Sequence, residues 1–241
     1  MRRLIPMLRA AWLGIRAERE RRAGVYDEAE RLAREALDLA GAVGGPEGLL
    51  HVRLLNTLGM ARKYRGRFHD AARAYLRAMR IARRRLGREH AIVATLYHNL
   101  GGLEHARGRH RRGEPFARRA VTLQERRRGP HHPDVARDVA ALAGILDGLG
   151  RHDEAEELHL RALRILEGRL GAGHAEVAYT LANLAACLHL QGRTAEAEPL
   201  AARALSLHER RLGAAHPEVA ISRENLGVIR AALGPTVPLR S

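Results

Sequence analysis

The stretch that decides the fold is residues 178–219, AYTLANLAACLHLQGRTAEAEPLAARALSLHERRLGAAHPEV, because its features return along the chain with one period of 42 residues. One glycine series keeps this period: Gly24, Gly66, Gly108, Gly150, Gly192 and Gly234. A second series keeps it three residues before a histidine: Gly87, Gly129, Gly171 and Gly213. An alanine series that includes Ala162 and Ala204 has the same interval. Self-similarity at a fixed interval is the sequence signature of a repeat array.

Each repeat is predicted to be a pair of amphipathic helices. Between the glycines, apolar residues recur at helical spacing, as in Val135, Val139 and Leu142. We expect the glycine at the Gly150 position to form a short turn between the two helices, since acidic residues that favour a helix N-terminus follow it. The glycine at the Gly171 position is expected to end the second helix in the left-handed conformation, which is easiest without a Cβ.

Several segments of this repeat carry a family resemblance: LANLA at 181–185, QGRTAEAEPL at 191–200, RAL at 203–205 and LGAAHPEVA at 212–220. They resemble the 42-residue tetratricopeptide repeats of kinesin light chains and related bacterial proteins, over about residues 10–234. HEAT and armadillo repeats have a similar length. They do not predict the small residues that this chain places in both helices of a repeat. These residues are Gly59, Gly101, Ala143, Ala185 and Gly227 in the first helix, and Ala29, Ala71, Ala155 and Ala197 in the second.

The resemblance and the repeat count imply an all-α fold, a right-handed α-α superhelix of five helix pairs with a C-terminal capping helix. The expected divisions are an N-terminal extension at 1–9, a single solenoid at 10–234 and a flexible tail at 235–241. The repeats fall at about 10–51, 52–93, 94–135, 136–177 and 178–219, and the capping helix at 220–234. The second helix of the first repeat is expected to stop early, because it runs into Gly41, Gly44, Gly45 and Pro46.

The resemblance also implies where a partner binds. In the family, the first helices line a concave surface, and an asparagine there commonly clamps the backbone of an extended peptide. A side-chain amide suits this task because it donates and accepts hydrogen bonds at once. The corresponding position holds Thr57, Asn99, Ala141, Asn183 and Asn225. The alternative is that these asparagines bond locally or face water.

Other inward positions of the first helices, Asp147 and Glu224 among them, extend this surface. The expected partner-binding groove comprises Arg53, Asn56, Lys63, His98, Asn99, His105, Asn183, His189 and Asn225.

The positive charge of the chain is localised. The net charge is +15, and residues 51–130 alone hold 21 basic against 5 acidic residues, a net charge of +16. Two groups of arginines have structural interpretations. Arginines at the ends of second helices meet the negative end of the helix dipole, and Arg77, Arg119, Arg161 and Arg203 share one repeat position. Neither interpretation accounts for the bunching of Arg73, Arg80, Arg109, Arg111, Arg112 and Arg118 in the same two repeats. The sequence therefore predicts a basic patch in the second and third repeats, comprising Arg73, Arg77, Arg80, Arg84, Arg111, Arg112, Arg118 and Arg119.

A field of this sign attracts acidic partners, so an acidic protein or peptide is the preferred partner. Nucleic acid is the alternative, although stacking aromatic residues are scarce nearby. Self-association is a third hypothesis, and the oligomeric state stays open.

Chemical motifs are lacking. The chain has no Walker lysine motif or nucleophile elbow, and the pair His131 and His132 has no cysteine pair to complete a metal site. We expect no enzyme activity, no cofactor and no metal. The single cysteine, Cys187, is expected to be buried and excludes an intrachain disulfide, which favours a reducing, cytoplasmic setting. No stretch approaches the length of a membrane span. The sequence therefore predicts a non-catalytic interaction scaffold.

Overall fold

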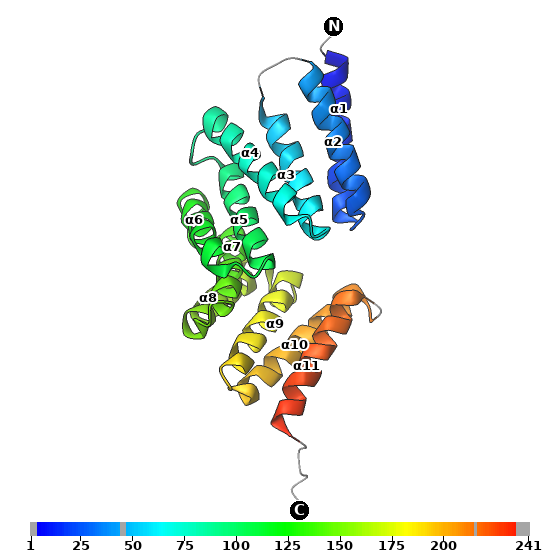
Figure 1. Cartoon of the computed structure of the whole chain (residues 1–241). Helices are drawn as coiled ribbons and strands as arrows, with labels where there is room; N and C mark the ends of the chain where they lie inside the picture. Colours follow the sequence, from blue (N-terminus) through cyan, green and yellow to red (C-terminus); the bar gives the residue numbers. More distant parts are fainter. Residues whose placement is uncertain (1–3, 44–46, 215, 235–241) are drawn as a thin grey trace, which may run out of the picture. The chain divides into compact units, whose positions relative to one another are not determined.

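The computed structural model describes residues 4–43, 47–214 and 216–234, and these residues form eleven α-helices and no strand (Figure 1). The predicted all-α fold of helix pairs is confirmed. The chain divides into two compact units, residues 1–123 and 124–241, with the boundary inside α6. The predicted tail at 235–241 lies outside the described residues.

The first unit contains three pairs of helices, counting the part of α6 that belongs to it. Their bounds are α1 Leu4–Arg22, α2 Tyr26–Ala42, α3 Leu49–Tyr64, α4 Phe68–Leu86, α5 Ala91–Ala106 and α6 His110–Arg128. From α1 to α5 each helix packs on the next, and the first helices of neighbouring repeats also touch, α1 on α3 and α3 on α5.

The second unit repeats this arrangement. Its helices are α7 Pro133–Asp147, α8 His152–Leu170, α9 Ala175–Leu190, α10 Thr194–Leu212 and α11 Pro217–Leu233. Consecutive helices pack together, and α9 contacts both α7 and α11. The lone helix α11 begins at Pro217 and ends at Leu233.

The N-terminal helix begins earlier than expected. It starts at Leu4, so residues 4–9 of the predicted extension are helical, and Arg9 forms an ion pair with Glu35 at 3.1 Å. Arg16, at a position where other repeats have leucine, places its guanidinium over the Trp12 ring at 5.0 Å. The second helix ends at Ala42, two residues shorter than α4, as its glycines predict.

The two recurring loop residues have defined roles. Gly87, Gly171 and Gly213 end second helices with φ of 81° to 85°, as predicted, but with ψ of 150° to 166°. This backbone is not the left-handed helical conformation that the sequence suggested, and it is essentially open to glycine alone. The histidine three residues later caps the next first helix. In His90 and His174, Nδ1 accepts the backbone N–H two residues on at 3.2 Å.

The small residues of the first helices permit close packing. Gly59 in α3 lies against Tyr75 in α4, a fully buried side chain. A Cβ added at Gly59 would meet Tyr75 Cε1 at 2.5 Å, whereas a Cβ at Gly227, the same repeat position in α11, would meet nothing within 4 Å. The large ring therefore requires the glycine only in the second repeat.

We expect Gly59→Ala to lower the free energy of unfolding by about 1–2 kcal/mol, because overpacking strain exceeds the gain in helix propensity. The matched variant Gly227→Ala should raise it by up to about 1 kcal/mol. Urea unfolding followed by circular dichroism measures both. Equal stabilisation by the two substitutions would contradict the packing argument.

Candidate functional site

In the first unit, two of the expected groove residues bind each other. The Asn99 amide on α5 donates to Asn56 Oδ1 on α3 at 2.7 Å. Thr57, at the asparagine position of its repeat, is buried and donates to Glu18 Oε2 at 3.2 Å. The local-bonding alternative therefore describes Asn99, and these polar contacts join neighbouring repeats.

The other groove candidates of this unit differ in environment. Arg53 is exposed and His98 is half-buried. Lys63 is half-buried with Nζ 5.6 Å from the centre of the Tyr64 ring, and burial lowers the pKa of its ammonium group. The His105 ring lies against His110, with their Nδ1 atoms 3.2 Å apart.

In the second unit, the asparagines reach the surface. Asn183 and Asn225 are exposed. His189 Nδ1 lies 3.2 Å from Thr194 Oγ1. A cavity of about 100 Å³ brings His189 and Asn225 together with Ser222. This unit therefore offers amide groups that a peptide backbone can reach.

Part of the predicted basic patch is already neutralised. Arg77 pairs with Glu47 at 2.5 Å, and Arg118 pairs with Glu114 at 2.8 Å. The repeat position of Arg77 is structural, because its counterparts Arg161 and Arg203 bind Glu125 and Glu167, each at 2.5 Å.

Arg119 occupies the same position but lies over the Tyr97 ring at 5.8 Å. Arg161 and Arg203 bind Glu125 and Glu167, but the corresponding position in the second repeat holds Arg83, so Arg119 has no acid at that place. Within the described chain, no carboxylate pairs with Arg119 or with the exposed residues Arg80, Arg84, Arg111 and Arg112.

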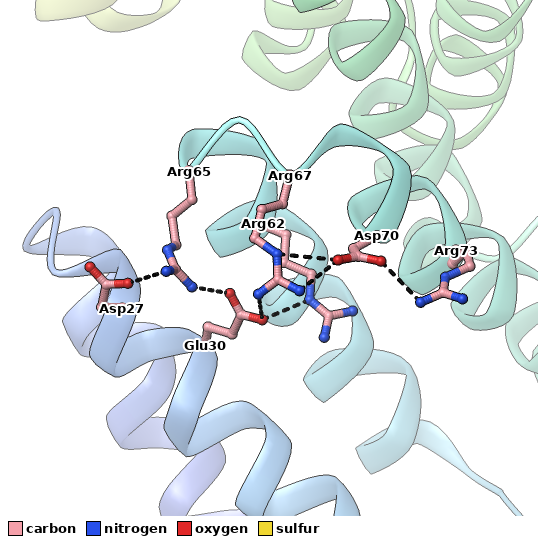
Figure 2. A network of polar contacts seen from close by, with 7 residues as sticks. All are labelled: Asp27, Glu30, Arg62, Arg65, Arg67, Asp70 and Arg73. Atoms are coloured by element: carbon pink, nitrogen blue, oxygen red, sulfur yellow. Dashed lines mark hydrogen bonds and ion pairs between the residues drawn. The ribbon is translucent and has the colours of Figure 1, made fainter.

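A buried carboxylate organises the junction of the first and second repeats, as Figure 2 shows. Glu30 on α2 accepts from Arg62 at 3.0 Å, Arg65 at 2.5 Å and Arg67 at 2.8 Å. Arg65 also pairs with Asp27 at 2.5 Å. Burial opposes ionisation of Glu30, but the hydrogen bonds from Arg62 and Arg65 outweigh it and hold the pKa of the carboxyl below its usual range.

The network continues along the second repeat. Asp70 pairs with Arg67 at 2.6 Å and with Arg73 at 2.9 Å. Arg73 of the predicted basic patch is therefore partly neutralised.

The second unit contains the same junction. Glu156 occupies the repeat position of Glu30 and binds Arg193 at 2.6 Å and Gln191 at 3.0 Å. At the last junction, Glu198 pairs with Arg230 at 2.7 Å. A carboxylate on the second helix of one repeat, bound by cations of the next, is thus a recurring element of the stack.

The junction of the second and third repeats lacks this carboxylate. His69 and Ala72 stand where the first junction has Asp27 and Glu30, while Arg107 and Arg109 keep the positions of Arg65 and Arg67. These four residues define what we call the 2/3 corner. Arg107 is bound by Glu104 at 3.0 Å.

Arg109 is the distinctive residue of the 2/3 corner. In the second repeat, Asp70 lies three residues after Arg67 and pairs with it. In the third repeat, the residue three places after Arg109 is Arg112, which cannot pair with it. In the part of the chain that the structure describes, Arg109 pairs with no carboxylate. An open cavity of about 720 Å³ lies here, lined by Arg107 and Arg109 from one repeat and by His69 and Asp70 from the other. Guanidinium groups with free donors bind carboxylates or phosphates.

Sequence reasoning located the charge excess but missed its origin. Acids that neutralise framework arginines in other repeats are replaced by Ala72, Arg83 and Arg112. Comparing acidic residues position by position across the repeats would have revealed it.

We expect Glu30→Gln to lower the free energy of unfolding by about 1–3 kcal/mol at pH 7, because three guanidinium groups lose their buried counter-ion. The pKa of Glu30 is lowered in the folded state, so its contribution is complete above its ordinary pKa of 4.5 and is lost as the pH falls through the folded pKa. Denaturant unfolding at a series of pH values measures this difference.

The matched variant Glu198→Gln removes a more exposed pair and should cost less than about 1 kcal/mol. If the free energy of unfolding of Glu30→Gln differed from that of the unmodified chain by the same amount at every pH, the ion-network explanation would be contradicted.

Comparisons with known proteins support the repeat assignment. The family model of the tetratricopeptide repeat matches residues 8–84, 92–168 and 176–234. No match was found among curated proteins. Of the described helices, none combines the length and apolar character that crossing a membrane requires.

Three solved structures illustrate the likeness. BtubC (BKLC) from P. vanneervenii is 23% identical with a TM-score of 0.66, over 93% of this chain and 84% of that one. A putative kinesin light chain of Podosopora anserina with nearly identical TPR-like repeats is 22% identical with a TM-score of 0.64, over 76% and 88%. A Rap protein complexed with Competence and Sporulation Factor is 19% identical with a TM-score of 0.61, over 94% and 65%. At these identities the likeness shows the fold.

Proposed function

The chain belongs to the tetratricopeptide repeat family, and on this basis we propose that it is a non-catalytic scaffold that binds a segment of another protein in a cytoplasmic setting. The fold supports this function, since stacked helix pairs present extended binding surfaces. The Rap protein of similar fold forms its complex with Competence and Sporulation Factor. The exposed amides of Asn183 and Asn225 would contact the backbone of the bound segment.

The observation that carries the proposal further is the 2/3 corner. Other junctions of the stack fill this place with their own carboxylate, Glu30 or Glu156. At the 2/3 corner, Arg109 retains its donors and an open cavity gives access to them. An Asp or Glu side chain of a partner would take the place of the missing acid, so the proposed partner is an acidic segment.

The test supplies the missing acid within the chain. We expect Ala72→Glu to bind Arg109 internally, as Glu156 binds Arg193, and so to raise the Kd of a fluorescein-labelled poly-glutamate peptide about tenfold, the equivalent of one ion pair of about 1.4 kcal/mol. Fluorescence anisotropy in about 0.15 M salt measures the affinity.

The control Ala72→Gln introduces a side chain of nearly the same shape as glutamate but without its charge. It should leave the Kd within about twofold of the value for the unmodified chain. Equal losses in Ala72→Glu and Ala72→Gln would show that bulk, and not charge, matters there. A poly-glutamate peptide that fails to bind the unmodified chain, together with a single-stranded oligonucleotide that binds it at the same salt, would favour the nucleic-acid alternative.

Self-association is the second candidate function, and α1 favours it. This helix leaves a row of large apolar side chains exposed: Leu4, Ile5, Leu8, Trp12 and Ile15. Exposed apolar surface of this kind is typical of an interaction face.

We expect light scattering of the full chain to give a mass above one chain that rises with concentration. The double variant Leu8→Glu with Ile15→Glu should give the mass of one chain, because it places charges on the exposed face while leaving the buried Ala10 and Leu13 intact. A single-chain mass for the unmodified protein at every concentration would rule this function out.

A further inference from the structure

A compact polar cluster lies in the core of the second unit, where α7, α8 and α9 meet. Asp147 ends α7, His152 begins α8 and Cys187 lies within α9. One ligand atom of each, a carboxylate oxygen, an imidazole nitrogen and the sulfur, lies within 4.8 Å of the other two. Three side chains of the types that bind transition metals are thus brought together from three helices.

The spacing suits a tetrahedral ion. Zinc bond lengths of about 2.0–2.3 Å place tetrahedral ligand atoms about 3.3–3.8 Å apart. Asp147 Oδ1 and His152 Nδ1 are 3.1 Å apart, and the three ligand atoms lie within 4.8 Å of one another. Small rotations of the side chains would seat an ion among them. Three protein ligands leave a fourth position for water.

The surroundings hold these side chains in place. His159, which is fully buried, has Nε2 3.1 Å from the second oxygen of Asp147. The Gln191 amide donates to Cys187 Sγ at 3.6 Å. Groups that orient a coordinating carboxylate and donate to a coordinating sulfur are the usual outer partners of a metal site. His159 Nδ1 is buried and has no hydrogen-bond partner within the described chain.

Packing alone does not require this cluster. At the repeat position of Cys187 the first repeat carries Arg19, and the others carry the apolar residues Ala61, Leu103, Ile145 and Ile229. At the position of His159 they carry Ala33, Tyr75, Ala117 and Ala201. Burying polar groups costs free energy unless they gain partners. At this junction the polar side chains partner one another, with Asp147 against both His152 and His159, so several groups that can bind a metal meet in one place.

Access and ionisation are also compatible with an ion. The side chains of Asp147 and His152 are 16% and 25% exposed, so a metal can enter from their side. A divalent cation would hold the Cys187 sulfur as the thiolate, because a coordinated thiol is deprotonated.

We propose that Asp147, His152 and Cys187 form a zinc site that ties the fourth repeat to the fifth. Zinc binds Cys187 Sγ, His152 Nδ1 and one oxygen of Asp147, with a water molecule in the fourth position. The thiol proton passes to solvent when the Zn–S bond forms, and the imidazole proton of His152 resides on Nε2. This inference is independent of the acidic partner proposed above, since the ligands are outside the 2/3 corner.

The test uses the full chain, purified under reducing conditions and stripped of metal with a chelator. Cobalt(II), a spectroscopic substitute for zinc, should bind at one per chain and give a thiolate-to-cobalt charge-transfer band. Zinc should displace the cobalt and raise the Tm. Cys187→Ala should abolish the band and weaken zinc binding by more than about a hundredfold, the upper range of losses for outer-partner mutations.

His110→Gln is the matched control, because His110 occupies the repeat position of His152 but lies outside the cluster. It should leave the band and the Tm shift unchanged. A charge-transfer band absent from the unmodified chain, or a zinc-dependent Tm shift that persists in Cys187→Ala, would overturn the proposal. The charge-transfer band reports whether cobalt is bound to the sulfur. Circular dichroism of the same variants reports whether the chain is still folded, so loss of the site is distinguished from unfolding.

Discussion

A helix pair of this chain can bury its apolar face only against the next pair, and this constraint governs the rest of the structure. Within each pair the two helices approach closely, which the small residues of the first helices permit. Gly59 receives the Tyr75 ring, and Gly101 lies against Ala117, where an added Cβ would be 3.3 Å from the backbone nitrogen. The junctions between successive pairs also differ from one another in their polar groups.

Those polar groups divide the junctions into two kinds. Where Glu30 or Glu156 is present, the arginines of the following repeat are bound internally. Where Ala72 replaces the acid, Arg107 and Arg109 remain, but Glu104 stands at the position of Arg62 and binds Arg107. Among the described residues Arg109 keeps no carboxylate partner, so the loss of acids at Ala72 and Arg112 adds to the positive charge of the second and third repeats. The core of the second unit adds a different polar group, the Asp147 cluster, at one junction.

Much of the fold was predictable from the sequence. The glycine and alanine series predicted the helix pairs, the turn positions and the final lone helix α11. Local detail was less predictable, because it depends on geometry that periodicity does not specify. The backbone of Gly87 has a ψ of 166°, outside the left-handed helical region, and the recurring histidine proved to be a helix cap. Likewise α1 begins at Leu4, inside the predicted extension, and leaves Leu8, Trp12 and Ile15 exposed.

The sequence by itself determined the period, the helix pairing and the uneven charge, because each follows from local propensity and from residue type at a repeated position. Only the tertiary structure decided which polar groups meet. Asn99 binds Asn56 of the preceding repeat, Arg109 faces an open cavity, and Cys187 joins Asp147 and His152. These partners lie in different helices, and their contact depends on how side chains project from packed helices. Stacking brings residues about one period apart into contact, and the side chains then decide whether they bind each other or leave a site for a ligand.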